Sequence, residues 1–179
     1  MKEVIRRLRS YQTVDGSFSY WPGGTAPNAW GTVYAIHFLL EAEKKGYLVP
    51  EGMKRNALND LSRIARNWKP EASYSAESEE MTQAYRLFVL ALGQVAEVGA
   101  MNRLKESKTL MSMSRYLLAA GYALVGRPDV SKELVVKTTA LTTACSGYDQ
   151  TFGSDLRDAS IRLMTLCLLD GGKEAALLA

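Results

Sequence analysis

A glycine-rich, aromatic segment that runs directly into an apolar helical pattern constrains this chain most. Residues 12–24 read Q-T-V-D-G-S-F-S-Y-W-P-G-G, and residues 29–46 carry apolar side chains on almost every side of a helix. The Asp-Gly dipeptide inside the first segment is typical of tight turns. The spacing of Gln12, Gly16 and Phe18 suits a tight turn between two helices of a helical barrel, with the aromatic ring folded back over the turn.

The rest of the chain predicts further helices of two kinds. Some are apolar on nearly every side, as buried helices are, and others carry one apolar stripe. We expect buried helices at residues 29–46, 77–97, 109–126 and 156–170, and helices with one apolar stripe at 51–68 and 129–137. A short polar piece is expected at 101–106, and a final helix from near Lys173.

The helix expected at 51–68 shows its two sides clearly in the sequence. Its apolar stripe consists of Met53, Ala57, Leu61, Ile64 and Trp68. The opposite side, which we expect to meet solvent, consists of Lys54, Arg55, Asp60, Arg63 and Arg66.

Glycines mark the expected ends of several of these helices. Glycine favours the residue just after a helix, and the glycines expected there are Gly46, Gly99, Gly126 and Gly171. Long non-helical spans are expected at 13–28 and 139–154. The stretch 133–139 (E-L-V-V-K-T-T) could also form a short strand.

Together these elements predict an all-α fold with alternating inner and outer helices. This alternation suits an α/α toroid or an α-solenoid. The glycine–aromatic turn favours the toroid, here as an incomplete ring, and a second such turn is expected at Tyr148–Gly153. We expect one domain over residues 1–179, cut from a longer multidomain chain, because both ends lie within helical patterns.

Composition excludes several classes of function. The 22 basic and 19 acidic residues are interspersed, so no basic patch for nucleic acid is expected. No apolar run reaches the roughly 18 residues of a membrane span. The two cysteines, Cys145 and Cys167, match neither a metal-binding spacing nor a disulfide framework. We expect no metal and no cofactor.

Two places could carry acid–base chemistry, and each has a structural alternative. Asp155 and Asp158 lie one turn apart at a helix start, as a catalytic carboxylate pair or as a helix cap with a charge near the helix dipole. His37 is the only histidine, on a helix expected to be buried, where a hydrogen-bonded core histidine competes with a catalytic one. We predict no catalytic residue.

Four aromatic side chains near the turn could form a groove. Tyr20, Trp21, Trp30 and Tyr34 could stack on sugars or isoprenoids. Alternatively, Trp21 and Trp30 are largely buried and pack the 13–28 segment onto the end of the barrel.

Several motifs in order resemble the thioester domain of bacterial α2-macroglobulins. The opening block is followed by Glu41-Ala42 and G-Y-L-V-P at 46–50, which resemble a helix exit in that family. The stretches 84–92 and 99–104 (G-A-M-N-R-L) resemble its next helix and loop, and F-G-S-D-L-R-D-A at 152–159 also looks familial.

This resemblance implies an all-helical part of a broad-spectrum protease inhibitor, located in the periplasm or outside the cell. In that family a Cys–Gln thioester, with its two residues three positions apart, captures proteases covalently. Here Tyr148 follows Cys145 and Asp170 follows Cys167 at that spacing, so neither cysteine fits, and the family motif lies upstream of the glycine turn.

The resemblance therefore predicts a non-catalytic chain whose partners are proteases, bound through the full-length protein, and other domains of its parent. Asn28 is the nearest candidate for a thioester-proximal residue. An α/α-toroid enzyme that acts on a carbohydrate or an isoprenoid is the alternative.

Overall fold

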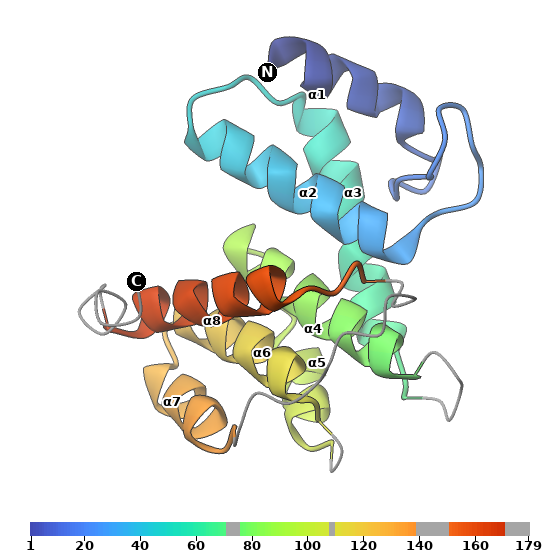
Figure 1. Cartoon of the computed structure of the whole chain (residues 1–179). Helices are drawn as coiled ribbons and strands as arrows, with labels where there is room; N and C mark the ends of the chain where they lie inside the picture. Colours follow the sequence, from blue (N-terminus) through green and yellow to red (C-terminus); the bar gives the residue numbers. More distant parts are fainter. Residues whose placement is uncertain (71–75, 108–109, 139–150, 171–179) are drawn as a thin grey trace. The chain divides into compact units, whose positions relative to one another are not determined.

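The computed structural model describes residues 1–70, 76–107, 110–138 and 151–170, shown as coloured ribbon in Figure 1. Within these residues the regular elements are all helices, which confirms the all-α fold. The only strand-like pairings found there are two isolated bridges, Gln12 with Phe18 and Ser19 with Pro27. The chain divides into two compact units, Met1–Asn67 and Trp68–Ala179, here called the first and the second unit.

The first unit contains one short helix and two long ones. The long helices pack against each other, and the segment 12–28 joins the short N-terminal pieces to them. The elements are α1 (Lys2–Leu8), a 3-10 turn η1 (Arg9–Tyr11), α2 (Ala29–Lys44) and α3 (Glu51–Asn67).

Helix α2 ends as its sequence predicts. Gly46 has a φ of 82°, in the left-handed region where glycine is favoured. The Tyr47 amide donates to the Ala42 carbonyl (3.0 Å), and the Gly46 amide donates to Glu43 (2.8 Å). This pattern is a Schellman motif, which satisfies the last carbonyl groups of a helix.

The expectation that α2 is buried on nearly every side is wrong. Val33, Ile36 and Leu39 are buried, but Tyr34 is 64% exposed. The first turns of the side of α2 that is not fully buried carry Trp30 and Tyr34, and charges appear there only from Glu41 on, so most of the helix looks apolar in sequence. The amphipathic character expected of α3 is confirmed, because Met53, Ala57 and Leu61 are buried while Arg63 and Arg66 are exposed.

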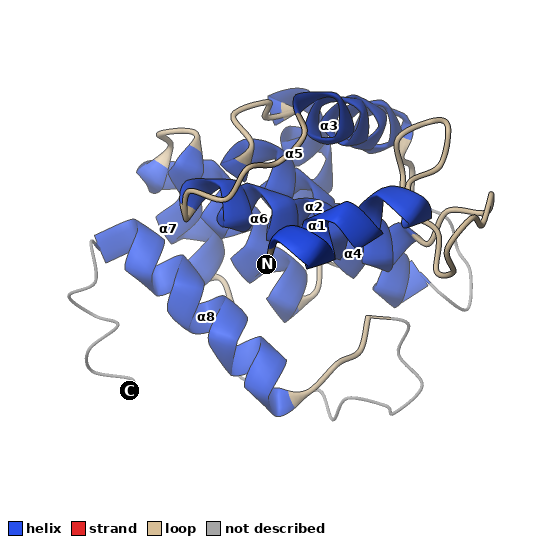
Figure 2. Ribbon diagram, turned by 90° about the horizontal axis from the view of Figure 1, so that it is seen from above, coloured by secondary structure: helices blue, strands red, loops and turns tan. Residues whose placement is uncertain are grey.

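The second unit is built around α6. This helix packs against α4, α5, α7 and α8, and Figure 2 shows α8 alongside α6 and α7. The elements are α4 (Ala76–Leu92), α5 (Val98–Lys105), α6 (Ser112–Leu124), α7 (Pro128–Val136) and α8 (Asp155–Asp170).

Helices α4 and α6 form the core of the second unit, as predicted. Leu87, Leu90 and Leu118 are fully buried between them and their neighbours. At Gly121 an added Cβ would lie 3.2 Å from the Met101 side chain and 3.6 Å from the backbone of Phe88. A methyl group here would be in ordinary contact with the α4 backbone and in tight contact with the Met101 side chain.

Two boundaries differ from the sequence prediction. Helix α4 ends at Leu92 rather than near 97, because Gln94 adopts a φ of 61° and the Val95 amide donates back to Leu90 (2.9 Å). Gly99 does not end a helix but lies in the first turn of α5. The left-handed residue that ends α4 is thus Gln94, whereas the sequence predicted Gly99 for this role.

The last two described helices give one confirmation and one correction. Residues 128–136 are helical, so the strand alternative for 133–139 is wrong over its described helical part. Helix α8 forms where expected but is not buried, since Leu156 is 77% exposed. It rests on α6 through the side that carries Thr165, whose hydroxyl donates to the Tyr116 carbonyl (3.0 Å).

Gly171, the helix expected from Lys173 and the turn through Tyr148 lie outside the described residues.

The finer architecture stays a prediction. Long buried helices alternate with short amphipathic ones in α4 to α7, as a toroid requires. An incomplete ring within a single domain over 1–179 stays a prediction.

Candidate functional site

The glycine–aromatic turn, residues 12–18, packs closely against α3. Gly16 has a φ of 105°, and a Cβ there would lie only 2.4 Å from the Asn56 carbonyl oxygen. The Gln12 side-chain amide donates to the carbonyl of Gly16 (3.1 Å) and to that of Met53 on α3 (2.9 Å). Only glycine fits this close approach, and Gln12 attaches the turn to the helix.

The aromatic residue of the motif folds inward, as predicted. Phe18 is 2% exposed. Its backbone amide donates to the hydroxyl of Thr32 on α2 (2.9 Å), which in turn donates to the Phe18 carbonyl (3.1 Å). The predicted turn between two helices is therefore confirmed, and it is fixed to both α2 and α3.

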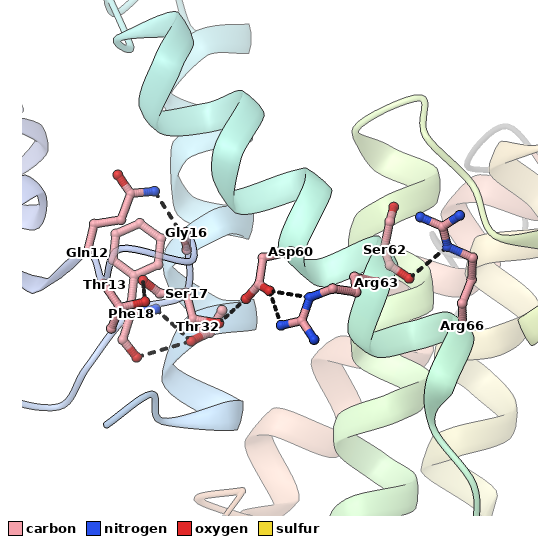
Figure 3. Close-up of polar contacts among 10 residues, drawn as sticks. All are labelled: Gln12, Thr13, Gly16, Ser17, Phe18, Thr32, Asp60, Ser62, Arg63 and Arg66. Carbon is pink, nitrogen blue, oxygen red and sulfur yellow. Dashed lines mark hydrogen bonds and ion pairs between the residues drawn. The ribbon is translucent and has the colours of Figure 1, made fainter. Parts of the chain in front are cut away.

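Asp60 is a buried carboxylate that the sequence prediction placed in solvent, wrongly. It is 5% exposed and accepts a hydrogen bond from the buried Ser17 hydroxyl (2.5 Å). Arg63 donates to it through Nε (3.1 Å) and Nη2, as Figure 3 shows. The missed signal is spacing, since Asp60 follows Met53 by seven residues and so shares its helix face.

The predicted aromatic groove is only partly assembled. The rings of Tyr20 and Trp21 meet edge to face at 5.0 Å between centroids. Both residues are exposed, as is Tyr34, and Trp30 is half-buried. A groove of all four residues stays a prediction.

The alternative role of Trp21 as a buried anchor is wrong, because it is 71% exposed. Hydrogen bonds hold this part of the segment instead. The Gly23 amide donates to the Ser10 carbonyl (2.7 Å), and the Ser19 hydroxyl lies within bonding distance of the carbonyls of Tyr11 (3.0 Å) and Trp21 (2.7 Å).

Asn28 is the N-cap of α2. Its side-chain oxygen accepts a hydrogen bond from the Gly31 backbone amide (2.6 Å), and its backbone amide donates to the Phe18 carbonyl (2.8 Å). Asparagine is a preferred cap because its side chain satisfies an amide at the helix start. A thioester-proximal role for Asn28 stays a prediction.

His37 lies half-buried on α2. Burial lowers the pKa of its imidazole below the ordinary value; the nearby Glu41 opposes this shift, and Lys44 adds to it. The neutral form is therefore favoured near pH 7. This setting suits a core histidine better than a charged catalytic one.

The two carboxylates at the start of α8 have different surroundings. The helix is capped by Ser154, whose hydroxyl accepts from the Arg157 amide (3.1 Å), so the prediction of Asp155 as the cap is wrong. Asp155 is exposed. Asp158 pairs with Arg157 (2.7 Å), which also donates to Thr151 (2.8 Å). The second carboxylate thus has a structural partner.

Among residues 1–70, 76–107, 110–138 and 151–170, no three His, Cys, Asp or Glu side chains come together as a metal site. In the same residues no helix combines the length and apolar character of a membrane span. Cys167 is exposed on α8, and Cys145 lies outside the described residues.

These features define a class: a protein whose described elements are helices and in which a glycine–aromatic turn is hydrogen-bonded to two packed helices. No family model matches the chain. Curated relatives do match it, and they are bacterial alpha-2-macroglobulins. The Escherichia coli protein is 28% identical over 170 residues, which cover 90% of this chain. The Xylella fastidiosa protein is 27% identical over 170 residues, or 91% of this chain. The resemblance found in the sequence is thereby confirmed.

The same similarity extends to three dimensions. Native E. coli alpha-2-macroglobulin, solved from domain MG7 to the C-terminus, superposes with a TM-score of 0.82 at 23% identity and covers 99% of this chain and 29% of its own. The trypsin-activated E. coli protein gives 0.81 at 23% identity, over 99% of this chain and 13% of its own. These matches show the fold. The chain spans about a tenth of the length of the curated relatives.

Proposed function

We propose that this chain is part of the thioester domain of a protein that traps proteases as bacterial alpha-2-macroglobulins do. The observation that supports it most is the collinear similarity to the E. coli protein over 90% of the chain. The glycine–aromatic turn, which carried the resemblance in sequence, is hydrogen-bonded to both α2 and α3.

Solved relatives indicate what kind of chemistry the parent would perform. The E. coli protein has been solved after activation by trypsin and after activation by porcine elastase. The Salmonella protein has been solved after reaction with methylamine. We infer that a parent of this chain responds to proteases in the same way and carries an amine-reactive group, in the periplasm or outside the cell.

In this proposal the chain itself is not an enzyme. Neither Cys145 nor Cys167 has a glutamine three residues later, so the reactive thioester would come from residues outside these 179. The chain would contribute helices of an incomplete α/α toroid, within one domain, that hold the reactive segment and contact other domains of the parent.

The test uses the full-length polypeptide that carries this chain. Incubation with trypsin should give conjugates that survive denaturing electrophoresis, and prior treatment with methylamine should abolish them. Methylamine should also release one new thiol per full-length molecule, and none from the 179-residue chain. Trypsin cleavage without any conjugate, or thiol release from the 179-residue chain, would contradict the proposal.

The exposed Tyr20–Trp21 pair favours one second candidate, a site that binds a glycan or an isoprenoid as in toroid enzymes. Calorimetric titration with oligosaccharides and with isoprenyl diphosphates distinguishes the two. We expect no heat of binding. Saturable binding that Trp21→Ala removes would favour the second candidate.

A further inference from the structure

Glu80 on α4 is a buried carboxylate with no part in the proposed function. It is 8% exposed. Its Oε1 accepts a hydrogen bond from the backbone amide of Met111 (2.9 Å), the N-cap residue of α6, whose own side chain makes no capping bond. In a capping box, a glutamate of the same helix binds the N-cap amide. Here a glutamate of the neighbouring helix binds it instead.

A second contact links the same carboxylate to α6. The hydroxyl of Ser114, which is fully buried in the first turn of α6, hydrogen-bonds to Glu80. The same hydroxyl lies 4.0 Å from the sulfur of Met81 on α4. A hydroxyl both donates and accepts, and a thioether accepts weakly. Glu80, Ser114 and Met81, here called the Glu80 cluster, therefore form a buried hydrogen-bonded set between α4 and α6.

The Glu80 cluster offers partners to both forms of the carboxyl group. When Glu80 is ionised, it accepts from the Met111 amide and from the Ser114 hydroxyl. When Glu80 is protonated, one of its oxygens becomes a donor. That oxygen can donate to the Ser114 hydroxyl, whose own hydrogen then turns to the Met81 sulfur. The added proton therefore costs neither Glu80 nor Ser114 its hydrogen bonds.

Burial and two neighbouring charges decide how readily Glu80 binds a proton. Burial raises the pKa of the Glu80 carboxyl above its ordinary value of 4.5, because a charge is disfavoured away from water. Among the described residues, the charged side chains that act on Glu80 are Glu77, one turn earlier on α4, and Arg115 on α6. Glu77 adds to the rise in pKa, whereas Arg115 and the two hydrogen bonds oppose it.

We propose that Glu80 is a proton-binding site that makes the contact between α4 and the start of α6 depend on pH. Opening this contact brings water to Glu80, and water stabilises the ionised form far more than the neutral form. The protonated form therefore holds the two helices together more firmly. The stability that Glu80 contributes is complete below its unfolded pKa, near 4.5, and is lost as the pH rises through the folded pKa.

Carbon-13 NMR of the 179-residue chain, labelled at its glutamate carboxyl groups, measures this proton binding directly. The resonance that disappears in Glu80→Gln belongs to Glu80. The same resonance in the urea-unfolded chain provides the reference value. We expect a higher pKa for Glu80 in the folded chain than in the unfolded chain. An equal or lower value would overturn the proposal.

Two variants that keep Glu80 should move its pKa in opposite directions. Ser114→Ala removes a donor that favours the ionised form, so the pKa of Glu80 should rise. Glu77→Gln removes a like charge, so the pKa of Glu80 should fall. Circular dichroism verifies that both variants fold. A pKa that Ser114→Ala leaves unchanged or lowers would show that the Glu80 cluster does not exist and would contradict the inference.

Hydrogen exchange of the Met111 amide tests the effect on the helix contact. Corrected for the intrinsic rate, its protection should fall as the pH rises through the folded pKa of Glu80, by up to about tenfold for each pH unit between the unfolded and folded values. Glu80→Gln, which resembles the neutral form, should show no such fall. The control is the Ser131 amide in the first turn of α7, which donates to the Arg127 carbonyl (3.1 Å) and should not follow this pKa. No fall at Met111, or a fall that Glu80→Gln shares, would overturn the proposal.

Discussion

At the scale of single residues, the first unit depends on one glycine, one serine and one carboxylate. Gly16 permits the backbone approach to α3, and the Ser17–Asp60 contact joins the turn to the same helix. Neither contact can be read from composition. Each arises because a tight turn brings residues 12–18 onto a helix more than thirty positions away in sequence.

Gly16→Ala should destabilise the protein by about 2–4 kcal/mol, because it combines left-handed strain with a backbone collision. Gly23→Ala is the matched control, since Gly23 has a φ of 71° but no atom within 4 Å of an added Cβ. It should lose only about 1 kcal/mol. Urea unfolding measures both, and equal losses would show that the collision with Asn56 is relieved at little cost.

A double-mutant cycle of Ser17→Ala and Asp60→Ala measures their contact. We expect a coupling free energy of about 1–3 kcal/mol, as for hydrogen bonds to a buried charge. The exposed pair Arg127–Asp129 is the control, and its coupling should be close to zero. Additive effects of Ser17→Ala and Asp60→Ala would mean that Asp60 is held by Arg63 alone.

His37 should give the protein a pH dependence of known sign. Because burial lowers the pKa of His37 in the folded state, its contribution to stability is complete above about pH 6.5. It is lost as the pH falls from there through the folded pKa. NMR titration of this single histidine should show a pKa below 6.5, and His37→Gln should flatten the stability curve over that interval. A folded pKa above 6.5 would contradict this prediction.

At the scale of elements, aromatic side chains divide sharply between core and surface. Phe18 and Trp21 lie three residues apart in one loop, yet one is buried and the other faces solvent. The difference follows from the hydrogen bonds of Ser19 and Gly23, which fix the loop through its backbone. The Trp21 ring is therefore not needed to hold the loop in place.

Trp21→Ala should therefore change stability by less than about 0.5 kcal/mol, whereas Phe18→Ala should lose about 3–5 kcal/mol. Thermal unfolding of the two variants provides the comparison. A large loss for Trp21→Ala would show that its ring supports the fold.

At the scale of the whole molecule, each unit has its own core. The second unit converges on α6, and Gly121 lies where this helix faces α4 and Met101 of α5. At this position there is room beside α4 and Met101 for about one methyl group.

Gly121→Leu should lose about 1–3 kcal/mol by overpacking. Gly121→Ala is the control, since the Met101 side chain can yield to one methyl group and alanine favours the helix. It should be nearly neutral. A loss for the alanine variant as large as for the leucine variant would mean that the two helices allow no added atom at all.

The sequence by itself determined the helices, most of their boundaries and the glycine–aromatic turn. These are local properties, encoded by periodicity and by turn residues such as Gly16 and Gly46. The resemblance to alpha-2-macroglobulins was also readable, because it rests on the order of short motifs.

The periodicity also predicted the buried side of α3 and the core helices α4 and α6, but only the tertiary structure decided the burial of several individual positions. Asp60 looked solvated and is buried, whereas Trp21 and Leu156 looked buried and are exposed. The physical reason is that side-chain chemistry specifies the cost of exposure, but burial depends on whether another element covers that position. The hydroxyl of buried Ser17 gives Asp60 a hydrogen-bond donor, whereas α8 packs against α6 and α7 and leaves Leu156 exposed.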